Sequence, residues 1–176
     1  MAQAMLEGQV VVITGSAGGI GRYAAKTFAE AGARVVVADV KPLDTIAAEL
    51  LAETAEPERV EQYIAAAHEL GESYGRDTAV LAAERAEATL DLRADRPADA
   101  VGRLEVTLER ARQIGQPYEI ARTARLAGKA YRARGSDGDD IRSKARLEEA
   151  RAIFERLGAE PDANLVRTML EQPLPA

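Results

Sequence analysis

The sequence predicts a mostly α-helical protein with a short α/β start, in which a βαβ unit is followed by an antiparallel array of helices. Two observations predict the start: two β-branched runs, at 10–14 and 34–40, flank a glycine-rich turn and a helical pattern. A third observation predicts the array. After Pro42 no β-branched run recurs, and alanine, leucine, arginine and glutamate repeat at helical spacing.

The βαβ unit occupies the first forty residues. The run VVVIT, from Val10 to Thr14, is typical of a strand buried on both faces of a parallel sheet. Gly15, Gly18, Gly19 and Gly21 come next, and IGRYAAKTFAEAG then has the spacing of a helix. RVVVADV completes the unit as a second buried strand with Asp39 near its end.

The glycine-rich turn has the chemistry of a nucleotide site. Glycines let the backbone approach a ligand closely, and the amides at the start of a helix attract a pyrophosphate. Asp39 lies 20 residues after Gly19, the usual offset of an acid that binds ribose hydroxyls. Its carboxylate would repel a 2′-phosphate, which favours NAD over NADP. The candidate cofactor-binding residues are Thr14, Gly15, Ser16, Gly19, Ile20, Gly21 and Asp39.

These residues also carry a family resemblance. TGSAGGIG, from Thr14 to Gly21, resembles the TGxxxGxG signature of short-chain dehydrogenases/reductases, and the likeness covers about residues 6–41. The resemblance implies a Rossmann-like, NAD-binding start. The alternative is that the glycines only form a tight turn between a strand and a helix.

The catalytic half of that family is absent from the sequence. Short-chain dehydrogenases use a Tyr followed four residues later by a Lys, and none of the five tyrosines here has that partner. The Asn-Asn-Ala-Gly stretch of the family is also missing. EATLDLRAD, at 87–95, faintly resembles the third strand of the family but is embedded in a helical pattern. We therefore predict no catalytic residue, and an enzymatic role stays open but disfavoured.

The remainder predicts seven helices. Proline, glycine and aspartate breaks separate segments near 44–55, 58–71, 76–92, 97–114, 118–133, 141–157 and 162–171. The composition changes at Lys41-Pro42, so we predict two domains, a truncated dinucleotide-binding unit over 1–41 and a helical domain over 42–176.

The helical domain contains an internal repeat. HELGESY (68–74) aligns with RQIGQPY (112–118), matching Gly71 to Gly115, and RLEVTLERARQIG (103–115) aligns with RLEEARAIFERLG (146–158). A period in the low forties indicates a helical array. ARAIFERLGAEPD (150–162) resembles the degenerate tetratricopeptide-like repeats that end large bacterial regulators, which implies protein–protein interaction. The alternative is a plain antiparallel bundle.

A basic stripe marks one predicted helix of this array. Arg122, Arg125, Lys129 and Arg132 recur at the spacing of one helix face. They are candidate partner-binding residues whose side chains could bind carboxylates or a phosphate. The favoured alternative is a solvated face paired with Glu105 and Glu109 of the preceding helix.

Composition excludes several classes of function. With no Cys and one His, the chain of 176 residues lacks disulfides, cysteine nucleophiles and a His-rich metal centre, so we predict no metal site. A net charge of −6 without a basic domain predicts no nucleic-acid binding. No signal peptide or membrane span is apparent, which favours a cytoplasmic protein. Open sheet edges make a homo-oligomer a further expectation.

The sequence as a whole predicts a non-catalytic hybrid in which a helical-repeat module binds a protein partner and a truncated unit resembles an NAD-binding domain. Two alternatives stay open. One is an NAD(H)-dependent oxidoreductase fragment of the short-chain dehydrogenase type, completed by a partner or a second copy. The other is an adenine-nucleotide sensor.

Overall fold

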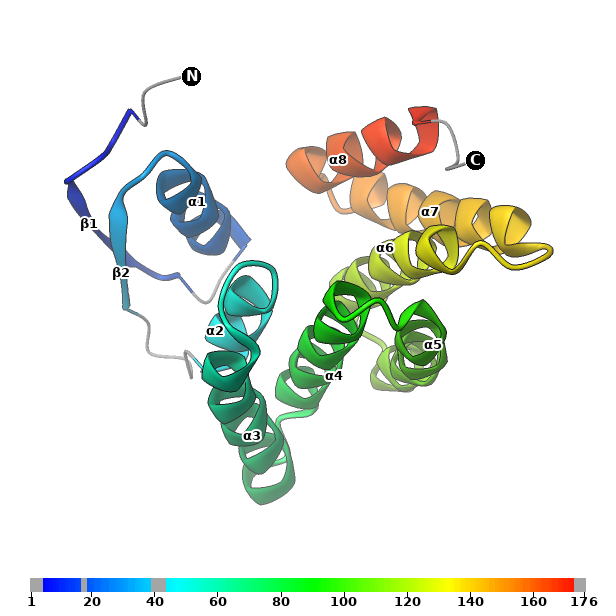
Figure 1. Cartoon of the computed structure of the whole chain (residues 1–176), viewed down its shortest axis with the longest axis horizontal. Coiled ribbons are helices and arrows are strands. Elements are labelled where there is room, and N and C mark those ends of the chain that lie inside the picture. Colours follow the sequence, from blue (N-terminus) through cyan, green and yellow to red (C-terminus); the bar gives the residue numbers. More distant parts are fainter. Residues whose placement is uncertain (1–4, 17–18, 39–43, 173–176) are drawn as a thin grey trace.

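The structure, a computed structural model, describes residues 5–16, 19–38 and 44–172. The chain begins with β1 (Val10–Thr14), α1 (Gly19–Glu30) and β2 (Arg34–Ala38) (Figure 1). In the described part of the chain after β2 there are seven helices: α2 (Asp44–Ala52), α3 (Pro57–Tyr74), α4 (Asp77–Arg93), α5 (Pro97–Ile114), α6 (Pro117–Arg134), α7 (Asp139–Arg156) and α8 (Glu160–Glu171). The mostly helical fold with a short parallel α/β start is confirmed.

The βαβ start, as far as the structure describes it, is a two-stranded parallel sheet covered by one helix. β1 and β2 pair in register from Val10 opposite Arg34 to Thr14 opposite Ala38. Helix α1 contacts both strands, and the residues of each strand alternate between exposed and half-buried. The prediction that both faces are buried is therefore wrong. Val10, Val12 and Val36 on the uncovered face are 56%, 64% and 50% exposed, because no described element packs there.

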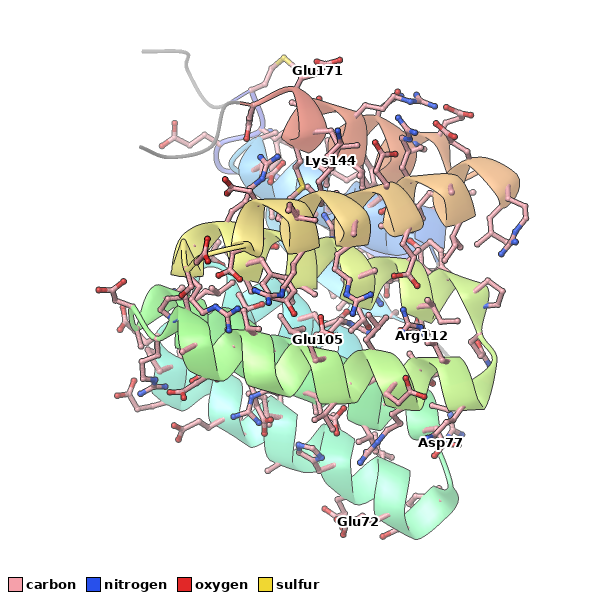
Figure 2. The ribbon with its side chains drawn as sticks, turned by 90° about the vertical axis from the view of Figure 1, so that its right-hand side faces the viewer. Glu72, Asp77, Glu105, Arg112, Lys144 and Glu171 are labelled. Atoms are coloured by element: carbon pink, nitrogen blue, oxygen red, sulfur yellow. The ribbon has the colours of Figure 1, made fainter. Side chains whose placement is uncertain are left out.

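The helices form two layers. Each helix from α2 to α8 packs against the next one, and α4 also contacts α2 and α6. Helices α3, α5 and α7 form the outer layer, which faces the viewer in Figure 2, while α2, α4 and α6 lie inside it on the side of the βαβ unit (Figure 1). EATLDLRAD lies in α4 and the turn after it, so this stretch does not form a strand.

Glycines in the left-handed region end three of the helices. Gly75, Gly115 and Gly135, with φ of 60°, 71° and 61°, come directly after α3, α5 and α6. Such a residue reverses the chain sharply, and glycine adopts it without a Cβ clash. The predicted match of Gly71 to Gly115 is wrong, because Gly71 lies inside α3 and Gly75 holds the corresponding cap position.

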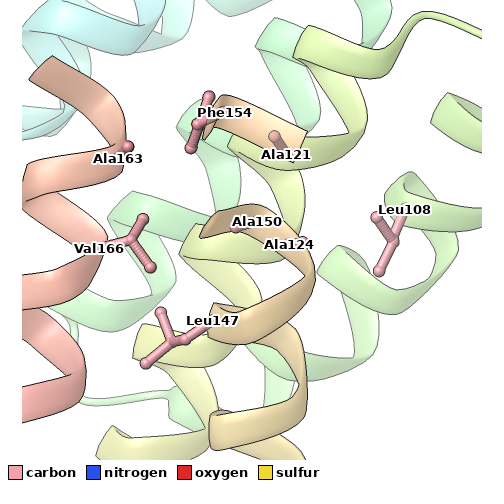
Figure 3. Close-up of a cluster of buried hydrophobic side chains, with 8 residues drawn as sticks. All are labelled: Leu108, Ala121, Ala124, Leu147, Ala150, Phe154, Ala163 and Val166. Carbon is pink, nitrogen blue, oxygen red and sulfur yellow. The ribbon is translucent and has the colours of Figure 1, made fainter. Parts of the chain in front are cut away.

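The core of the array is built mainly from alanines and a few larger side chains. One cluster joins four helices and consists of Leu108, Ala121, Ala124, Leu147, Ala150, Phe154, Ala163 and Val166, all fully buried (Figure 3). Helices α6 and α7 pack most closely at Gly128 of α6. A Cβ added there would lie 2.7 Å from the Leu147 Cγ of α7, so only glycine fits this contact without a shift.

Candidate nucleotide site and cationic groove

The glycine-rich turn lies where β1 ends and α1 begins. Gly15 has a φ of 68°, and a Cβ added at Gly21 would lie 2.3 Å from the Gly15 carbonyl oxygen. The turn is therefore so tight that Gly21 is required by packing alone. Ser16 is buried, and its Oγ donates a hydrogen bond of 3.3 Å to the Ala38 carbonyl oxygen at the end of β2.

This arrangement brings most of the predicted cofactor residues together. Thr14 ends β1, Gly19 begins α1, and the Ile20 side chain is 90% exposed beside the turn. The carboxyl ends of both parallel strands and the amino end of α1 meet here, which is where an α/β unit holds a phosphate. Asp39, the predicted ribose ligand, lies outside the described residues, as do Ala17 and Gly18.

Two of the tyrosines are hydrogen-bonded to carboxylates, and a third lies half-exposed on α1. Tyr23 is half-exposed on α1, and the nearby Lys26 directs its Nζ to Glu53, at 2.8 Å. Tyr118 donates a hydrogen bond to Asp162, and Tyr131 donates one to Glu105. Burial and the Glu105 carboxylate raise the pKa of Tyr131, the direction opposite to the one a tyrosine base needs.

Metal-ligating side chains do not gather in the part of the chain that the structure describes, where no group of three or more His, Asp or Glu is arranged to hold an ion. His68 instead has its Nε2 3.1 Å from Glu87, whose other oxygen accepts a hydrogen bond from Arg103. This pairing links α3, α4 and α5.

Arg122, the first residue of the basic stripe, belongs to a buried ion cluster. It pairs with Glu49 of α2, and the Arg85 Nε of α4 donates to the same carboxylate at 2.7 Å. Arg85 also donates to Glu119 at 2.6 Å and to the Thr123 hydroxyl at 3.1 Å. Although burial alone lowers the pKa of Arg122, Glu49 and Glu119 raise it above its ordinary value. Arg122 is therefore engaged in holding α2, α4 and α6 together.

The other three residues of the stripe line a groove instead. Arg125, Lys129 and Arg132 border a cavity of about 670 Å³ that also contacts Lys26 of α1, Arg93 of α4, and Leu165 and Met169 of α8. The predicted pairing of the stripe with Glu105 and Glu109 is wrong. Glu105 accepts hydrogen bonds from Arg146 of α7 and from Tyr131 of α6, and Glu109 pairs with Arg112 of its own helix. Neither carboxylate pairs with the stripe, and Figure 2 labels Glu105 and Arg112 on α5.

Sequence reasoning missed Lys26, Arg93, Leu165 and Met169. They come from three helices far apart in the chain, and only the packing of those helices brings them to one groove. Glu49 was also missed, although its position on α2 determines which arginine of the stripe is neutralised.

The first part of the chain is similar to known proteins. The family model described as short chain dehydrogenase matches residues 9–92. The chain is 60% identical over 37 residues to (+)-cis,trans-nepetalactol synthase of Nepeta racemosa, covering 20% of this chain and 14% of that protein. It is 54% identical over 48 residues to momilactone A synthase of Oryza sativa subsp. japonica, covering 27% and 17%. No solved structure matches the chain.

The predicted resemblance to short-chain dehydrogenases is thus confirmed for the N-terminal part, and the match extends past the predicted limit of residue 41 into α4. The family implies NAD or NADP as the cofactor, in agreement with the NAD expectation. The chain spans a small fraction, 14% and 17%, of the two curated relatives. None of the described helices is long and apolar enough to cross a membrane.

Proposed function

We propose that this protein is a non-catalytic hybrid, in which a truncated NAD-binding unit over residues 1–41 is joined to a helical-repeat module over 42–176 that binds another protein. The unit retains the phosphate-binding turn of a dehydrogenase. The helical module replaces the remaining strands of the enzyme and provides the interaction surface.

The proposal rests on the change of structure after the second strand. Within the described residues the sheet contains β1 and β2, and from α2 onward the chain is helical. A complete dinucleotide fold has a second mononucleotide-binding half that encloses the nicotinamide. Here that half and the Tyr–Lys pair have no counterpart among the described elements, whereas the tight Gly15–Gly21 turn is retained. Binding of the ADP half of NAD without hydride transfer fits this arrangement.

The spacing of the helices supports the repeat. The outer helices α3, α5 and α7 begin at residues 57, 97 and 139, and each has 18 residues. Gly115 and Gly158, near the ends of α5 and α7, both have positive φ and hold equivalent positions in the aligned RLEVTLERARQIG and RLEEARAIFERLG. Stacked helix pairs of this kind expose extended surfaces that bind proteins.

Calorimetric titration with NAD, ADP-ribose and NADP tests the nucleotide site. We expect saturable binding of NAD and ADP-ribose and weaker binding of NADP. A Gly19→Trp variant introduces an indole at the amino end of α1, where the pyrophosphate is proposed to bind, and should abolish the binding. Gly102→Trp is the matched control, because a side chain at Gly102 of α5 meets open space. No heat with wild-type protein at millimolar ligand would overturn the NAD-binding part of the proposal.

The uncovered sheet face favours a second candidate, an oxidoreductase fragment or nucleotide sensor completed by a partner or another copy. Val10, Val12 and Val36 are exposed on that face, and an apolar face of this kind is suited to packing against a partner or a second copy. NADH formation from NAD with a panel of secondary alcohols distinguishes the two candidates. NADH formation per protein molecule that rises with protein concentration supports an enzyme completed by a second copy. We expect no NADH formation.

A further inference from the structure

Three cations on α6 make no direct ion pair with the residues that the structure describes, although Asp162, Glu53 and Glu49 act on Arg125 from a distance. The side chains of Arg125, Lys129 and Arg132 make no ion pair or hydrogen bond to any described residue, unlike Arg122 one turn earlier. The Nε atoms of Arg125 and Arg132 are also closed to solvent and unpartnered within this part of the chain. The other guanidinium nitrogens of these two arginines and the Lys129 ammonium are charged donors without an acceptor among the described residues, so carboxylates that reach them would form charge-assisted hydrogen bonds.

The groove around these cations has one dominant sign of charge and an apolar floor. It runs between α4, α6 and α8, and Leu126, Leu165 and Met169 line it. Glu53 is the one carboxylate among its described lining residues, and this side chain already pairs with Lys26 at 2.8 Å. Arg93 directs its guanidinium to the Ala52 and Ala55 carbonyl oxygens at the end of α2. The three α6 cations therefore remain for a ligand.

We propose that this groove binds an acidic segment of a partner protein, with carboxylates on Arg125, Lys129 and Arg132 and an apolar side chain against Leu165 and Met169. The inference rests on the proposed function as an interaction module and names the chemistry of the partner. Arg122 is not part of the site, since Glu49 neutralises it.

The geometry of α6 suits such a segment. Positions four and three residues apart on a helix are separated by about 6 and about 4.5 Å along its axis. Alternate side chains of an extended chain recur about every 6.6 Å, within reach of long arginine and lysine side chains. The protein as a whole carries a charge of −6, so an acidic segment is attracted to this groove and repelled from most of the remaining surface.

Fluorescence anisotropy with a labelled peptide tests the site. The probe is a short peptide in which glutamates alternate with alanine and leucine, and its control has glutamine at each glutamate. We expect the full-length protein to bind the glutamate peptide at low ionic strength, more weakly at about 0.15 M salt, and to ignore the glutamine peptide. A Lys129→Glu/Arg132→Glu variant should bind the glutamate peptide at least tenfold more weakly.

The matched control variant is Arg59→Glu/Arg156→Glu, which changes the net charge equally at exposed positions of α3 and α7 that do not line the groove. It should bind the peptide within about twofold of the wild-type protein. An equal loss in both variants, or no binding by the wild-type protein, overturns the inference. Competition by pyrophosphate or a single-stranded oligonucleotide but not by the glutamate peptide would identify a phosphate site instead, and would also overturn it.

NAD titration of the Lys129→Glu/Arg132→Glu variant separates this inference from the nucleotide site. Lost peptide binding with normal NAD binding assigns the effect to the groove. Photo-cross-linking residues placed at Lys129 in the groove and at Val106, exposed on the outer layer, test whether a partner binds in the groove or elsewhere on the helices. A partner captured from Val106 but not from Lys129 would keep the interaction module and discard the groove.

Discussion

The βαβ unit and the helical array differ in how completely they bury their apolar side chains. In the array, side chains such as Leu104, Leu108 and Phe154 are fully buried between stacked helices. In the βαβ unit, Val10 and Val12 have the β-branched sequence of a covered strand but face solvent. A β-branched run therefore predicts a strand without predicting that both of its faces are covered. The helices cover one another, whereas one face of the sheet is left open by the described elements.

The two regions meet through few contacts. Lys26 of α1 pairs with Glu53 beyond the end of α2, and both side chains are more than 40% exposed. A largely apolar cavity of about 510 Å³ separates Tyr23 and Phe28 of α1 from Tyr118 and Pro161 of the array. An exposed ion pair contributes little to stability, so the two regions are expected to respond separately to substitutions.

The largest effect is expected in the core of the array. Phe154→Ala removes a fully buried ring that forms a T-shaped pair with Tyr118, with the ring centroids 5.7 Å apart. We expect it to lower the free energy of unfolding by about 3–5 kcal/mol, measured by urea denaturation with helical circular dichroism. Ile141→Ala, at a position 76% exposed, is the control and should change it by less than about 0.5 kcal/mol. Equal losses would contradict the packing described for α7.

A smaller effect is expected at the start of α7. Asp139 is buried and accepts hydrogen bonds from Arg134 at 2.6 and 2.8 Å and from the Ser136 amide at 3.0 Å. The Arg134 hydrogen bonds, opposed by burial and aided by Ser136 and Arg142, hold the pKa of Asp139 well below its ordinary value of 3.8. Asp139→Asn should cost on the order of 2 kcal/mol near pH 7, since these bonds involve charged groups.

The pH dependence of that loss has a definite sign. A carboxyl whose pKa is depressed in the folded state stabilises it above the unfolded pKa, and this stability is lost as pH falls. The difference between wild type and Asp139→Asn should therefore shrink below about pH 4 in urea titrations. Asp137→Asn, at an exposed neighbouring position, should show no such trend. A stability difference between wild type and Asp139→Asn that grows as the pH falls would contradict a lowered pKa of Asp139.

A local effect is expected in the glycine turn. Gly21→Ala places a methyl group against the Gly15 carbonyl oxygen and should separate α1 from β1. Backbone amides of β1 and β2 should then exchange hydrogen faster, while the urea midpoint of the array stays within error. Gly102→Ala, in open space on α5, is the control. A shift of the array midpoint with Gly21→Ala would show that the regions unfold together.

The smallest effect on stability is expected on the uncovered sheet face. Val12→Asp should change the free energy of unfolding by less than about 0.5 kcal/mol, because the side chain is 64% exposed. We expect a second copy of the chain to cover this face, so that the wild-type protein self-associates and Val12→Asp does not. Light scattering across a concentration series measures both masses. Val106→Asp on α5 is equally exposed and should leave the mass unchanged. A wild-type protein that is monomeric throughout contradicts the expectation.

Much of the fold could be predicted from the sequence because its signals are local. The run VVVIT predicts β1 with its observed bounds. Pro57, Pro97 and Pro117 lie at the first positions of their helices, where a missing backbone N–H costs nothing. The register of the internal alignment could not be predicted. Gly71 and Gly75 are equally plausible caps by sequence, and only the backbone shows that Gly75 adopts the left-handed conformation.

The candidate sites also differ in how far they could be predicted from the sequence. The turn from Thr14 to Gly21 consists of contiguous residues and was predicted, although Asp39 lies outside the described residues. The pairing of the basic stripe depends on side chains far away in the chain. Glu49 lies 73 residues from Arg122, and no periodicity indicates that it neutralises this arginine. Nor does any local pattern indicate that Arg125, Lys129 and Arg132 have no ion pair within the described part of the chain.

The order in which the helices touch has a kinetic consequence. From α2 to α8 each helix packs on its neighbour in the chain, so the contacts close short loops. Topologies with such local contacts fold quickly. The pairing of β1 with β2 instead requires the intervening crossover through α1 to be in place. Although the βαβ unit is synthesised before the helices α2 to α8, its sheet is expected to be completed on a slower timescale than the helix pairs that come after it.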